Sequence, residues 1–383
     1  MKILYHHRVA SKDGQYVHIE ELTNALKQLG HEIIMVGPST VEKGSFGSEG
    51  GIVPFLKRFV PGFAYELMEF GYALVAYMKL RHAVLKYKPD WFYERYSLYM
   101  PAGVWLRKRF NLPMLLEINA PLFEERGKYC GLALPKLAKW TEEYAWRNAD
   151  IVLPVTAVLA ARVHEARVPI ERINVIPNGI DSKKFSTVPD TEQAKKRLGL
   201  GGGLVLGFTG FMREWHGLDQ VVDIVARNRD RKFHLLLVGD GPARGGIEEK
   251  ARMHGVEDCV TITGVVAREQ IADYVAAFDI ALQPDVVDYA SPLKLFEYLA
   301  LGRTIVAPAR PNIREVLSDG ENALLFDPDT PGALMESVER LCGDAALRKK
   351  LGEAARSTIQ EKGFTWKNNA RRVEALFHGL RMK

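Results

Sequence analysis

The sequence is poor in cysteine, and its three cysteines stand far apart. Cys130, Cys259 and Cys342 form no CxxC pair and have no histidine cluster beside them. Disulfide frameworks and structural zinc sites place their ligands at short, recurring spacings. The spacing therefore argues against both kinds of stabilisation and indicates a reducing compartment.

The sequence also lacks long apolar runs, short repeats and nucleic-acid reader modules. No uncharged apolar run reaches the roughly 18–20 residues of a membrane span, and the first residues enter a predicted strand, so we expect no signal peptide. No basic run is interleaved with aromatics, and the net charge of +5 is modest. We therefore expect a cytoplasmic protein that binds no nucleic acid and is free to contact phosphates or anionic lipids.

What the sequence has is a regular alternation of short apolar runs with helical patterns. The apolar runs predict strands at 3–6, 32–36, 91–94, 114–118, 151–154, 204–208, 234–238, 260–263, 280–283, 304–307 and 323–326. Helical patterns lie between them, such as those at 18–29, 137–148, 218–228, 271–277 and 332–342. This alternation predicts an α/β protein with parallel sheets covered by helices.

The length of the chain, 383 residues, suits two domains. The turn at Pro177-Asn178-Gly179 and the polar stretch 182–193 mark a boundary between them. We expect one domain at 1–182, a second at 183–365 and a final helix at 366–383.

The segment Ser291–Gly302 combines a helix start with a cation and a carboxylate. Ser291 is a good N-cap and Pro292 fits the first helical position, followed by Leu293. Lys294 and Glu297 are three residues apart and share a helix face. Helix-start amides and a cation attract diphosphate, and a carboxylate accepts from sugar hydroxyls. The segment predicts a nucleotide-sugar site, with a solvated Lys/Glu pair as the alternative.

Further candidate residues follow other predicted strands, where ligands of open α/β sheets bind. Gly14 lies in the predicted loop 13–18, and Arg213 and His216 lie in the loop after strand 204–208. Gly239 and Val266 follow the next two strands. Arg213 would contact diphosphate and main chain near Val266 would contact a base, but each loop taken alone is equally an ordinary turn.

Polar residues also end two strands of the first predicted domain. Arg95 follows strand 91–94, and Glu117 and Asn119 lie at the end of strand 114–118. Their side chains are expected to project toward a ligand. Asp285 and Asp288 have a spacing compatible with a metal, but two carboxylates alone favour an ordinary loop.

Residues 52–88 depart from the rhythm of the chain. Aromatic and aliphatic residues recur there at helical spacing, accompanied by lysines and arginines. One interpretation is packing against the N-terminal sheet. The other is a basic amphipathic surface that contacts a membrane or a lipid-linked acceptor, which would place the protein on the inner face of the plasma membrane.

The motifs occur in an order and spacing that the chain shares with a known family. They are Gly14 and His18, Gly30-His31-Glu32, Val175 to Asp181, Gly210 to Gly217, Val238 to Pro242, Ser291 to Gly302 and Asn322 to Phe326. The chain resembles the retaining glycosyltransferases of family 4, also called glycosyl transferases group 1. The resemblance implies the GT-B fold, with two Rossmann-like domains whose parallel sheets face each other across a cleft. It also implies that the final helix crosses back to the first domain and that no cofactor or metal ion is needed.

The resemblance assigns roles to individual residues. A nucleotide diphosphate sugar would bind mainly to the second domain, and a saccharide or lipid-linked acceptor to the first. The expected catalytic residues are Arg213, Lys294, Glu297 and Asn119. The expected donor-binding residues are Gly14, His216, Gly239, Val266, Tyr289, Ser291, Pro292 and Leu293. The expected acceptor-side residues are His18, Arg95 and Glu117.

Three positions depart from the family pattern. The family often has two glutamates eight positions apart; Glu297 is the second, but Tyr289 occupies the place of the first. His216 stands where a phosphate-contacting lysine is usual, so Arg213, His216 and Lys294 would share that task. Asn119 stands where many members have a histidine, and catalysis by that histidine does not carry over.

With this resemblance, the sequence predicts a retaining hexosyltransferase, and donor frequency in the family favours a UDP-sugar over a GDP-sugar. Its acceptor would be a hydroxyl of a saccharide or lipid-linked molecule, in cell-surface polysaccharide or glycolipid synthesis. Two alternatives stay open: a nucleotide-sugar epimerase or hydrolase on the same fold, and a non-catalytic nucleotide-binding scaffold.

Overall fold

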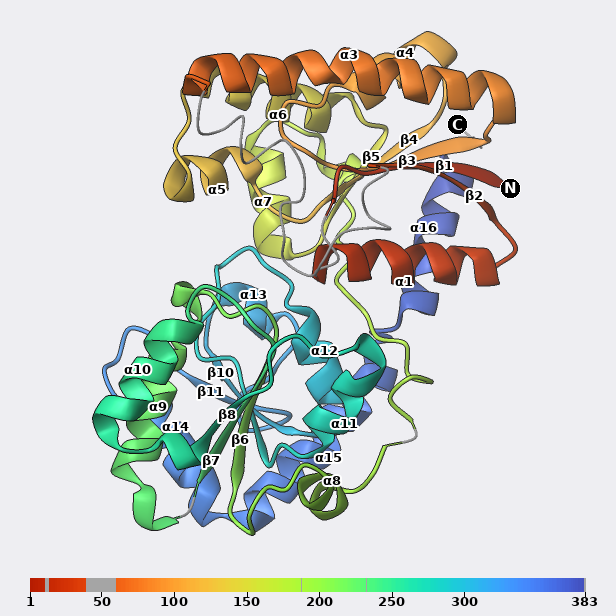
Figure 1. The fold of residues 1–383 in the computed structure, drawn as a ribbon. Helices are drawn as coiled ribbons and strands as arrows, with labels where there is room; N and C mark the ends of the chain where they lie inside the picture. The colour runs from red at the N-terminus through yellow and green to blue at the C-terminus, as the bar shows by residue number, and fades with distance from the viewer. Residues whose placement is uncertain (11–13, 39–59, 187, 232, 382–383) are drawn as a thin grey trace. The chain divides into compact units, whose positions relative to one another are not determined.

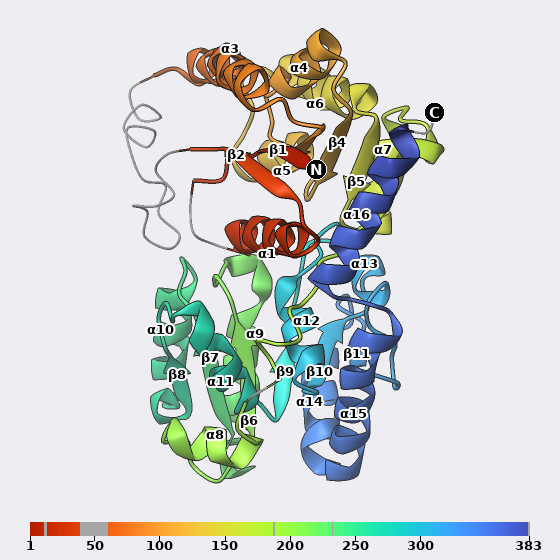
Figure 2. The ribbon, with the colours of Figure 1, turned by 90° about the vertical axis from the view of Figure 1, so that its right-hand side faces the viewer.

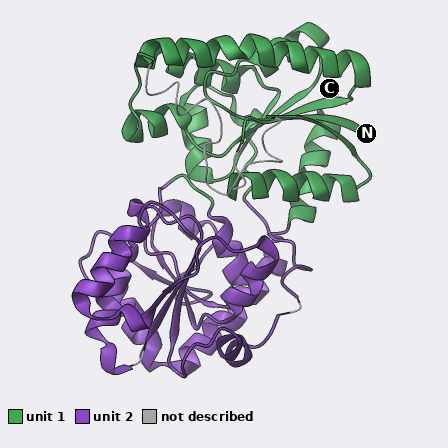
Figure 3. Ribbon diagram, viewed as in Figure 1, with its two compact units in different colours: residues 1–177, 289–291, 366–383 green, residues 178–288, 292–365 purple. Residues whose placement is uncertain are grey.

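The computed structural model describes residues 1–10, 14–38, 60–186, 188–231 and 233–381, and it divides into two α/β units. The first unit comprises residues 1–177, 289–291 and 366–383, and the second comprises residues 178–288 and 292–365 (Figure 3). Each unit is built on a parallel sheet, as the alternating pattern predicts.

The first unit contains, among its described residues, a five-stranded sheet of order β2-β1-β3-β4-β5. Its strands are β1 (Lys2–His6), β2 (Glu32–Val36), β3 (Trp91–Arg95), β4 (Met114–Ile118) and β5 (Ile151–Pro154). Its helices are α1 (Gly14–Gln28), α3 (Gly62–Tyr87), α4 (Ala102–Phe110), α5 (Leu122–Tyr129), α6 (Pro135–Asn148), α7 (Ala157–Glu165) and α16 (Trp366–Arg381). Helices α3, α4 and α6 cover one face of the sheet, and α1 and α16 cover the other (Figure 1).

Side chains of this sheet are buried on both faces. Leu4 and Phe92 belong to the core under α3, α4 and α6. On the opposite face, the ring of Trp91 stacks on Phe377 of α16, with 4.7 Å between the ring centroids. Figure 2 shows α16 running beside the sheet, and its contacts with α1 complete this layer. Two covered faces explain why the strands read as continuous apolar runs in the sequence.

The second unit contains, in its described part, a six-stranded sheet of order β11-β10-β9-β6-β7-β8. Its strands are β6 (Val205–Thr209), β7 (His234–Val238), β8 (Val260–Ile262), β9 (Ile280–Leu282), β10 (Thr304–Pro308) and β11 (Leu324–Phe326). Its helices are α8 (Thr191–Arg197), α9 (Leu218–Arg227), α10 (Arg244–His254), α11 (Ile271–Ala276), α12 (Leu293–Ala300), α13 (Pro311–Arg314), α14 (Ala333–Gly343) and α15 (Ala345–Glu361). Helices α9, α10 and α14 close the core on one face, while α11, α12 and α15 lie on the other (Figure 1).

All the predicted strands are present, and their ends differ from the predicted ends by one residue at most. The prediction of a loop at 13–18 is wrong. Helix α1 begins at Gly14, so Gly14 and His18 lie on a helix, while Asp13 lies outside the described residues. A glycine one residue after an aspartate looks like a turn in sequence, yet here it opens the helix.

Both sheets reverse their strand order at one place. The reversal lies between β1 and β3 in the first unit and between β9 and β6 in the second. Loops that follow the two strands of such a pair leave the sheet in opposite directions, which makes the carboxyl ends of these strands the usual ligand site of an open α/β sheet. The carboxyl ends of these two strand pairs are therefore candidate ligand sites.

We predict that Gly207→Ala destabilises the second unit. A Cβ atom on Gly207 in β6 would lie 2.1 Å from ring carbons of Phe278, so the ring must move. Overpacking of this kind costs about 1–3 kcal/mol. The measurement is the midpoint of urea unfolding. Gly245→Ala is the control, because a Cβ there meets nothing within 4 Å and alanine favours the helix; equal midpoints for the two variants would contradict the packing described.

Candidate functional site

Glycines bring two loops of the second unit into main-chain contact at the carboxyl edge of the sheet. The amide of Gly210, after β6, donates to the carbonyl of Val238 at 2.9 Å. A Cβ on Gly239 would lie 2.2 Å from the Gly210 oxygen, and one on Gly241 would lie 2.2 Å from the Met212 oxygen. Gly239 and Gly241 also have positive φ, +135° and +157°. Side chains at these positions would separate the loops.

A third loop joins the same edge. The amide of Gly239 donates to the hydroxyl of Thr263 at 3.2 Å, and Gly239 forms an isolated antiparallel bridge with Gly264. Val266 lies two residues further along and is half-buried. Gly239 and Val266, both predicted as donor-binding residues, therefore belong to one continuous edge formed by the loops after β6, β7 and β8.

Lys294 of α12 reaches the end of β6, across the point where the strand order reverses. Its Nζ lies 3.6 Å from the centroid of the Phe208 ring, and a Cβ on Gly210 would lie 3.4 Å from the same nitrogen. Burial lowers the pKa of Lys294 to about 7, against the opposing effect of Glu297. Within the described residues Lys294 has an aromatic ring as its close partner and no carboxylate at ion-pair distance. The charge of Glu297 offsets the burial of this cation only in part.

His216 supplies a neutral hydrogen-bond donor beside this lysine. It ends a short 3-10 turn (Glu214–His216), and the amide of Arg213 donates to its Nδ1 at 3.1 Å. Burial, Lys294 and Arg213 hold the pKa of His216 far below its usual range. A neutral imidazole that accepts at Nδ1 carries its proton on Nε2. The ring centroid is 5.2 Å from that of Phe208.

Arg213 is exposed but held by two aromatic rings. Its guanidinium carbon lies 4.8 Å from the centroid of Trp215 and 4.9 Å from that of Phe211. Stacking of this kind restrains a planar guanidinium without consuming its N–H donors. Arg213, His216 and Lys294, which the sequence predicts to share the phosphate contacts, are thus brought together by the loop after β6.

Sequence reasoning missed Tyr298, whose hydroxyl contacts the ends of both β6 and β9 where the strand order reverses. Its hydroxyl accepts from the amide of Thr209 at 3.0 Å and lies 3.5 Å from the carbonyl of Leu282. These groups end β6 and β9, where the two strands part and the Thr209 amide loses its ladder partner. A tyrosine directly after Glu297 on the buried side of the helix was the available signal.

The predicted start of α12 is wrong by one residue. Helix α12 begins at Leu293, and Pro292 occupies the N-cap with ψ of 120° and no side-chain cap bond. Ser291 is therefore not the cap, and it is grouped with the first unit. Proline fixes φ but not ψ, so the chain stays extended for one residue more than the motif suggests.

Tyr289 makes its contacts inside the first unit. Its hydroxyl donates to Glu125 at 2.5 Å, and its carbonyl accepts from the Thr156 hydroxyl at 3.0 Å. The guanidinium of Arg162 lies 5.4 Å from the centre of its ring. The structure groups Tyr289 with these residues rather than with the predicted donor-binding residues of the second unit.

In the first unit, four donors converge on Glu117 at the end of β4. Arg95 Nη1 lies 2.5 Å and His18 Nε2 3.1 Å from the carboxylate. The Tyr93 hydroxyl donates at 2.8 Å and the Asn119 amide at 2.5 Å. A carboxylate offers about four lone-pair positions. His18, Arg95, Glu117 and Asn119, which the sequence predicts as site residues of the first domain, are thus brought together. The four donors occupy the lone-pair positions of the Glu117 carboxylate.

The charge of Glu117 is stabilised inside the protein. Burial alone would raise the pKa of this carboxyl, but His18 and Arg95 hold it well below its usual range. Tyr93 was not predicted, although the alternation of Trp91, Tyr93 and Arg95 on one face of β3 places it beside Arg95.

A second buried pair lies at the reversal point of the first sheet. His6 Nδ1 is 2.6 Å from Glu94 Oε1, and both residues are almost fully buried. A Cβ on Gly103 of α4 would lie 2.0 Å from Glu94 Oε2, so this glycine makes room for the carboxylate. The two side chains thus satisfy each other by a hydrogen bond where β1 and β3 end.

Asp285 is engaged in an ion pair. The Nε of Arg310 lies 2.7 Å from one of its oxygens and Nη2 lies 3.0 Å from the other. Across the described part of the chain, no group of three or more His, Cys, Asp or Glu residues is arranged to hold a metal ion.

Two family models match the chain. The model described as "Glycosyltransferase Family 4" matches residues 12–184, and the one described as "Glycosyl transferases group 1" matches residues 203–344. Together they cover most of both units. The chain belongs to the group 1 glycosyltransferases.

Similar proteins and structures agree with this assignment. The alpha-D-kanosaminyltransferase of Streptomyces kanamyceticus is 26% identical over 57% of this chain and 58% of its own length. The match thus spans little more than half of that relative. Sucrose-phosphate synthase from Thermosynechococcus elongatus has a TM-score of 0.81 at 20% identity and covers 100% of this chain and 99% of its own. The Anabaena HepE protein in complex with UDP-glucose has a TM-score of 0.76 at 16% identity, covering 99% and 100%. These structures show that the units have the GT-B glycosyltransferase fold.

We predict that Glu117→Gln destabilises the protein by roughly 3 kcal/mol at pH 7, because the buried Arg95 loses its counter-charge and His18 loses its carboxylate partner. The stabilisation by Glu117 is present above the unfolded carboxyl pKa of about 4.3 and is lost as pH falls through its lower folded pKa. The wild type therefore loses stability below about pH 5 by more than the variant does.

Urea unfolding at pH 7 and pH 4 measures both effects. Glu143→Gln on α6 is the control, because its partly exposed pair with Arg147 is worth less than about 1 kcal/mol. An unchanged midpoint for Glu117→Gln would contradict the claim that the contacts of Glu117 stabilise the fold.

Proposed function

We propose that the protein transfers a sugar from a nucleotide diphosphate sugar to an acceptor hydroxyl. The observation that carries the proposal is the buried cation at the reversal point of the second sheet, whose burial Glu297 offsets only in part. Lys294 has a pKa of about 7 because it is desolvated against Phe208, and Arg213 and His216 stand beside it. A bound diphosphate would supply further negative charge to this edge of the sheet.

The chemistry follows from where charge develops. As the bond between the anomeric carbon and the diphosphate breaks, negative charge grows on the β-phosphate and positive charge on the sugar ring. Lys294 and Arg213 oppose the negative charge, and His216 donates its Nε2–H to a phosphate oxygen. Preorganised donors of this kind lower the barrier because they need no rearrangement during the reaction. Glu297, one turn after Lys294, accepts from the ribose hydroxyls.

On the acceptor side, we assign Glu117 a positioning role. Its carboxylate orients Arg95 and Asn119, whose remaining polar atoms would contact acceptor hydroxyls together with His18 and the main chain at Gly14. This refines the expectation from the sequence, in which Glu117 itself held the acceptor.

The finer features of the reaction are part of the same proposal. Family resemblance supports transfer with retention, and the name of the alpha-D-kanosaminyltransferase describes an α-linked sugar. The HepE complex with UDP-glucose supports a UDP-hexose donor over a GDP-sugar. Because cationic side chains face the diphosphate, the reaction would proceed without a metal ion. The acceptor would be a saccharide or lipid-linked molecule of cell-surface polysaccharide or glycolipid synthesis.

The direct test supplies UDP-glucose, UDP-galactose or GDP-mannose with and without a saccharide acceptor and measures nucleoside diphosphate release. We expect acceptor-dependent release with a UDP-hexose. Conversion of the donor without any acceptor would indicate an epimerase or hydrolase, and no release under any condition would indicate a non-catalytic scaffold.

We predict that Lys294→Ala lowers kcat by roughly 10²–10³-fold and also raises donor KM, because Lys294 faces the bound diphosphate in the ground state and opposes the charge that grows on it in the transition state. Glu297→Ala is expected to lower kcat and to raise donor KM, since ribose is bound in both states. Steady-state kinetics measure both, with the exposed Lys349→Ala as the control. Full activity of both site variants would contradict the roles assigned to Lys294 and Glu297.

We also predict that donor binding takes up a proton above neutral pH. Lys294 has a pKa of about 7 in the free protein, and a bound diphosphate raises that pKa. Affinity therefore falls as pH rises above 7, by up to about tenfold per unit, and this contribution is flat below 7. Titration calorimetry of UDP at pH 8 in two buffers of different ionisation heat measures the proton uptake. The uptake is expected to vanish in Lys294→Met, and its persistence would assign the proton to another group.

A further inference from the structure

Helix α3 turns a row of apolar side chains toward solvent. Phe63, Leu67, Leu74, Met78 and Leu85 are between 49% and 62% exposed. Their spacings of 4, 7, 4 and 7 residues place them on one side of the helix. A helix of a water-soluble domain normally buries such a stripe against its core. This stripe is called the α3 apolar face below.

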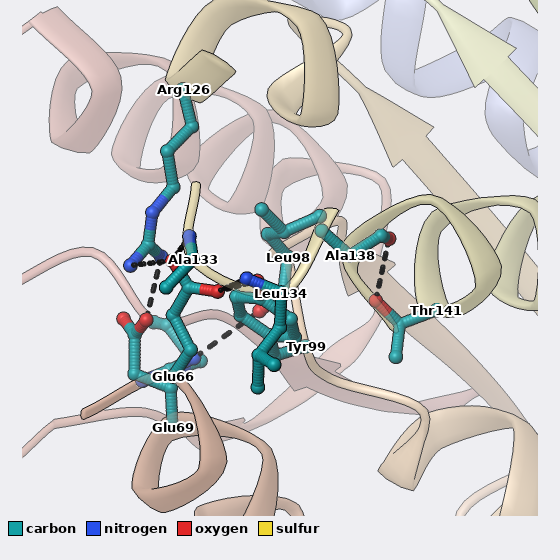
Figure 4. Close-up of polar contacts among 10 residues, drawn as sticks. Glu66, Glu69, Leu98, Tyr99, Arg126, Ala133, Leu134, Ala138 and Thr141 are labelled. Carbon is teal, nitrogen blue, oxygen red and sulfur yellow. Dashed lines mark hydrogen bonds and ion pairs between the residues drawn. The ribbon is translucent and has the colours of Figure 1, made fainter. Parts of the chain in front are cut away.

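The orientation of α3 is fixed from its inner side by a buried carboxylate. Glu66 accepts from the Tyr99 hydroxyl at 2.8 Å and from the amides of Ala133 and Leu134 at 2.8 and 2.7 Å (Figure 4). Burial would raise the pKa of Glu66, but these hydrogen bonds, aided by Arg126, lower it. Rotating α3 to bury its apolar face would break these hydrogen bonds and leave the Glu66 carboxylate buried without its partners.

Small and aliphatic residues complete the inner side. Ala73, Ala76 and Leu80 are buried in the core of the first unit and allow the helix to lie close to the sheet and α4. The predicted packing of the 52–88 segment on the N-terminal sheet therefore holds for this side of α3 only, and residues 52–59 lie outside the described residues. The outer side remains apolar in a fixed orientation.

The charges around the α3 apolar face are of one sign. Lys79, Arg81, Lys86 and Lys88 are exposed on α3 or directly after it. The two carboxylates of α3 have partners within the first unit: Glu66 as described, and Glu69 with Arg126 at 2.5 Å. A protein–protein seam is typically flanked by charges of both signs, whereas an anionic bilayer calls for cations alone.

We propose that the α3 apolar face docks the protein on a bilayer that contains anionic lipids. The apolar side chains enter the boundary between headgroups and acyl chains, and the lysines and arginine contact lipid phosphates. Among the described helices, none is both long and apolar enough to cross a membrane, so docking takes place on the surface. The proposal does not depend on the proposed reaction, since vesicle binding is measured without donor or acceptor.

The test measures flotation of the full chain with vesicles of phosphatidylcholine alone or with phosphatidylglycerol. We expect binding to the anionic vesicles, reduced at least tenfold by Leu74→Ser/Met78→Ser. Lys79→Gln/Lys86→Gln is expected to reduce it by roughly fivefold for each cation at low salt. Ile170→Ser and Met253→Ser are matched controls, because both residues are exposed apolar side chains elsewhere. Since all these side chains are exposed, unfolding midpoints should not change.

Three results would overturn the proposal. The first is binding of Leu74→Ser/Met78→Ser to anionic vesicles at the wild-type level, and the second is no binding of the wild type. The third is a wild-type dimer in sedimentation velocity that this variant dissolves while neither form binds vesicles, which would assign the face to a second copy of the chain.

Discussion

The burial of both faces of two parallel sheets is the constraint on which the rest of the structure depends. Helices cover both faces of each sheet, so most side chains between the layers are apolar and the charged side chains of the candidate sites lie where strands end. At the carboxyl edge, the reversal of strand order sends neighbouring loops apart. Both units show this: Glu94 and His6 lie at the reversal in the first sheet, and Lys294 and Tyr298 lie at the reversal in the second.

The two edges differ in how their charges are balanced. In the first unit Glu117 balances Arg95 and His18, and Glu94 pairs with His6. These contacts restrain the side chains at that edge. In the second unit the Lys294 Nζ lies over the Phe208 ring, and burial lowers the pKa of this lysine to about 7. An edge whose buried cation is only partly offset is suited to an anionic ligand, and this asymmetry is the physical reason for proposing that the donor binds to the second unit and the acceptor to the first.

The sequence predicts the strands well because each is a short apolar run between turn signals, which a doubly covered sheet requires. It also singles out Arg213 and His216, which follow a strand end, and Lys294, which lies at a helix start and shares a helix face with Glu297; their contacts with a diphosphate are part of the proposal. It cannot show that Tyr298 satisfies the Thr209 amide or that Glu117 is saturated by four donors, because those facts depend on residues far apart in the chain. The start of α12 at Leu293 was missed because Pro292 leaves ψ free, and α1 was started too late because Gly14 resembles a turn.

The central claim is that the carboxyl edge of the second sheet is a diphosphate site. The most direct measurement is a thermal-shift series of uridine, UMP, UDP and UDP-hexoses at equal concentration, because a ligand of the native state raises the melting temperature more the tighter it binds. The account predicts a rise with UDP and its sugars that uridine does not produce and that Lys294→Met abolishes. Equal shifts with uridine and UDP, or a UDP shift that Lys294→Met leaves intact, would contradict it.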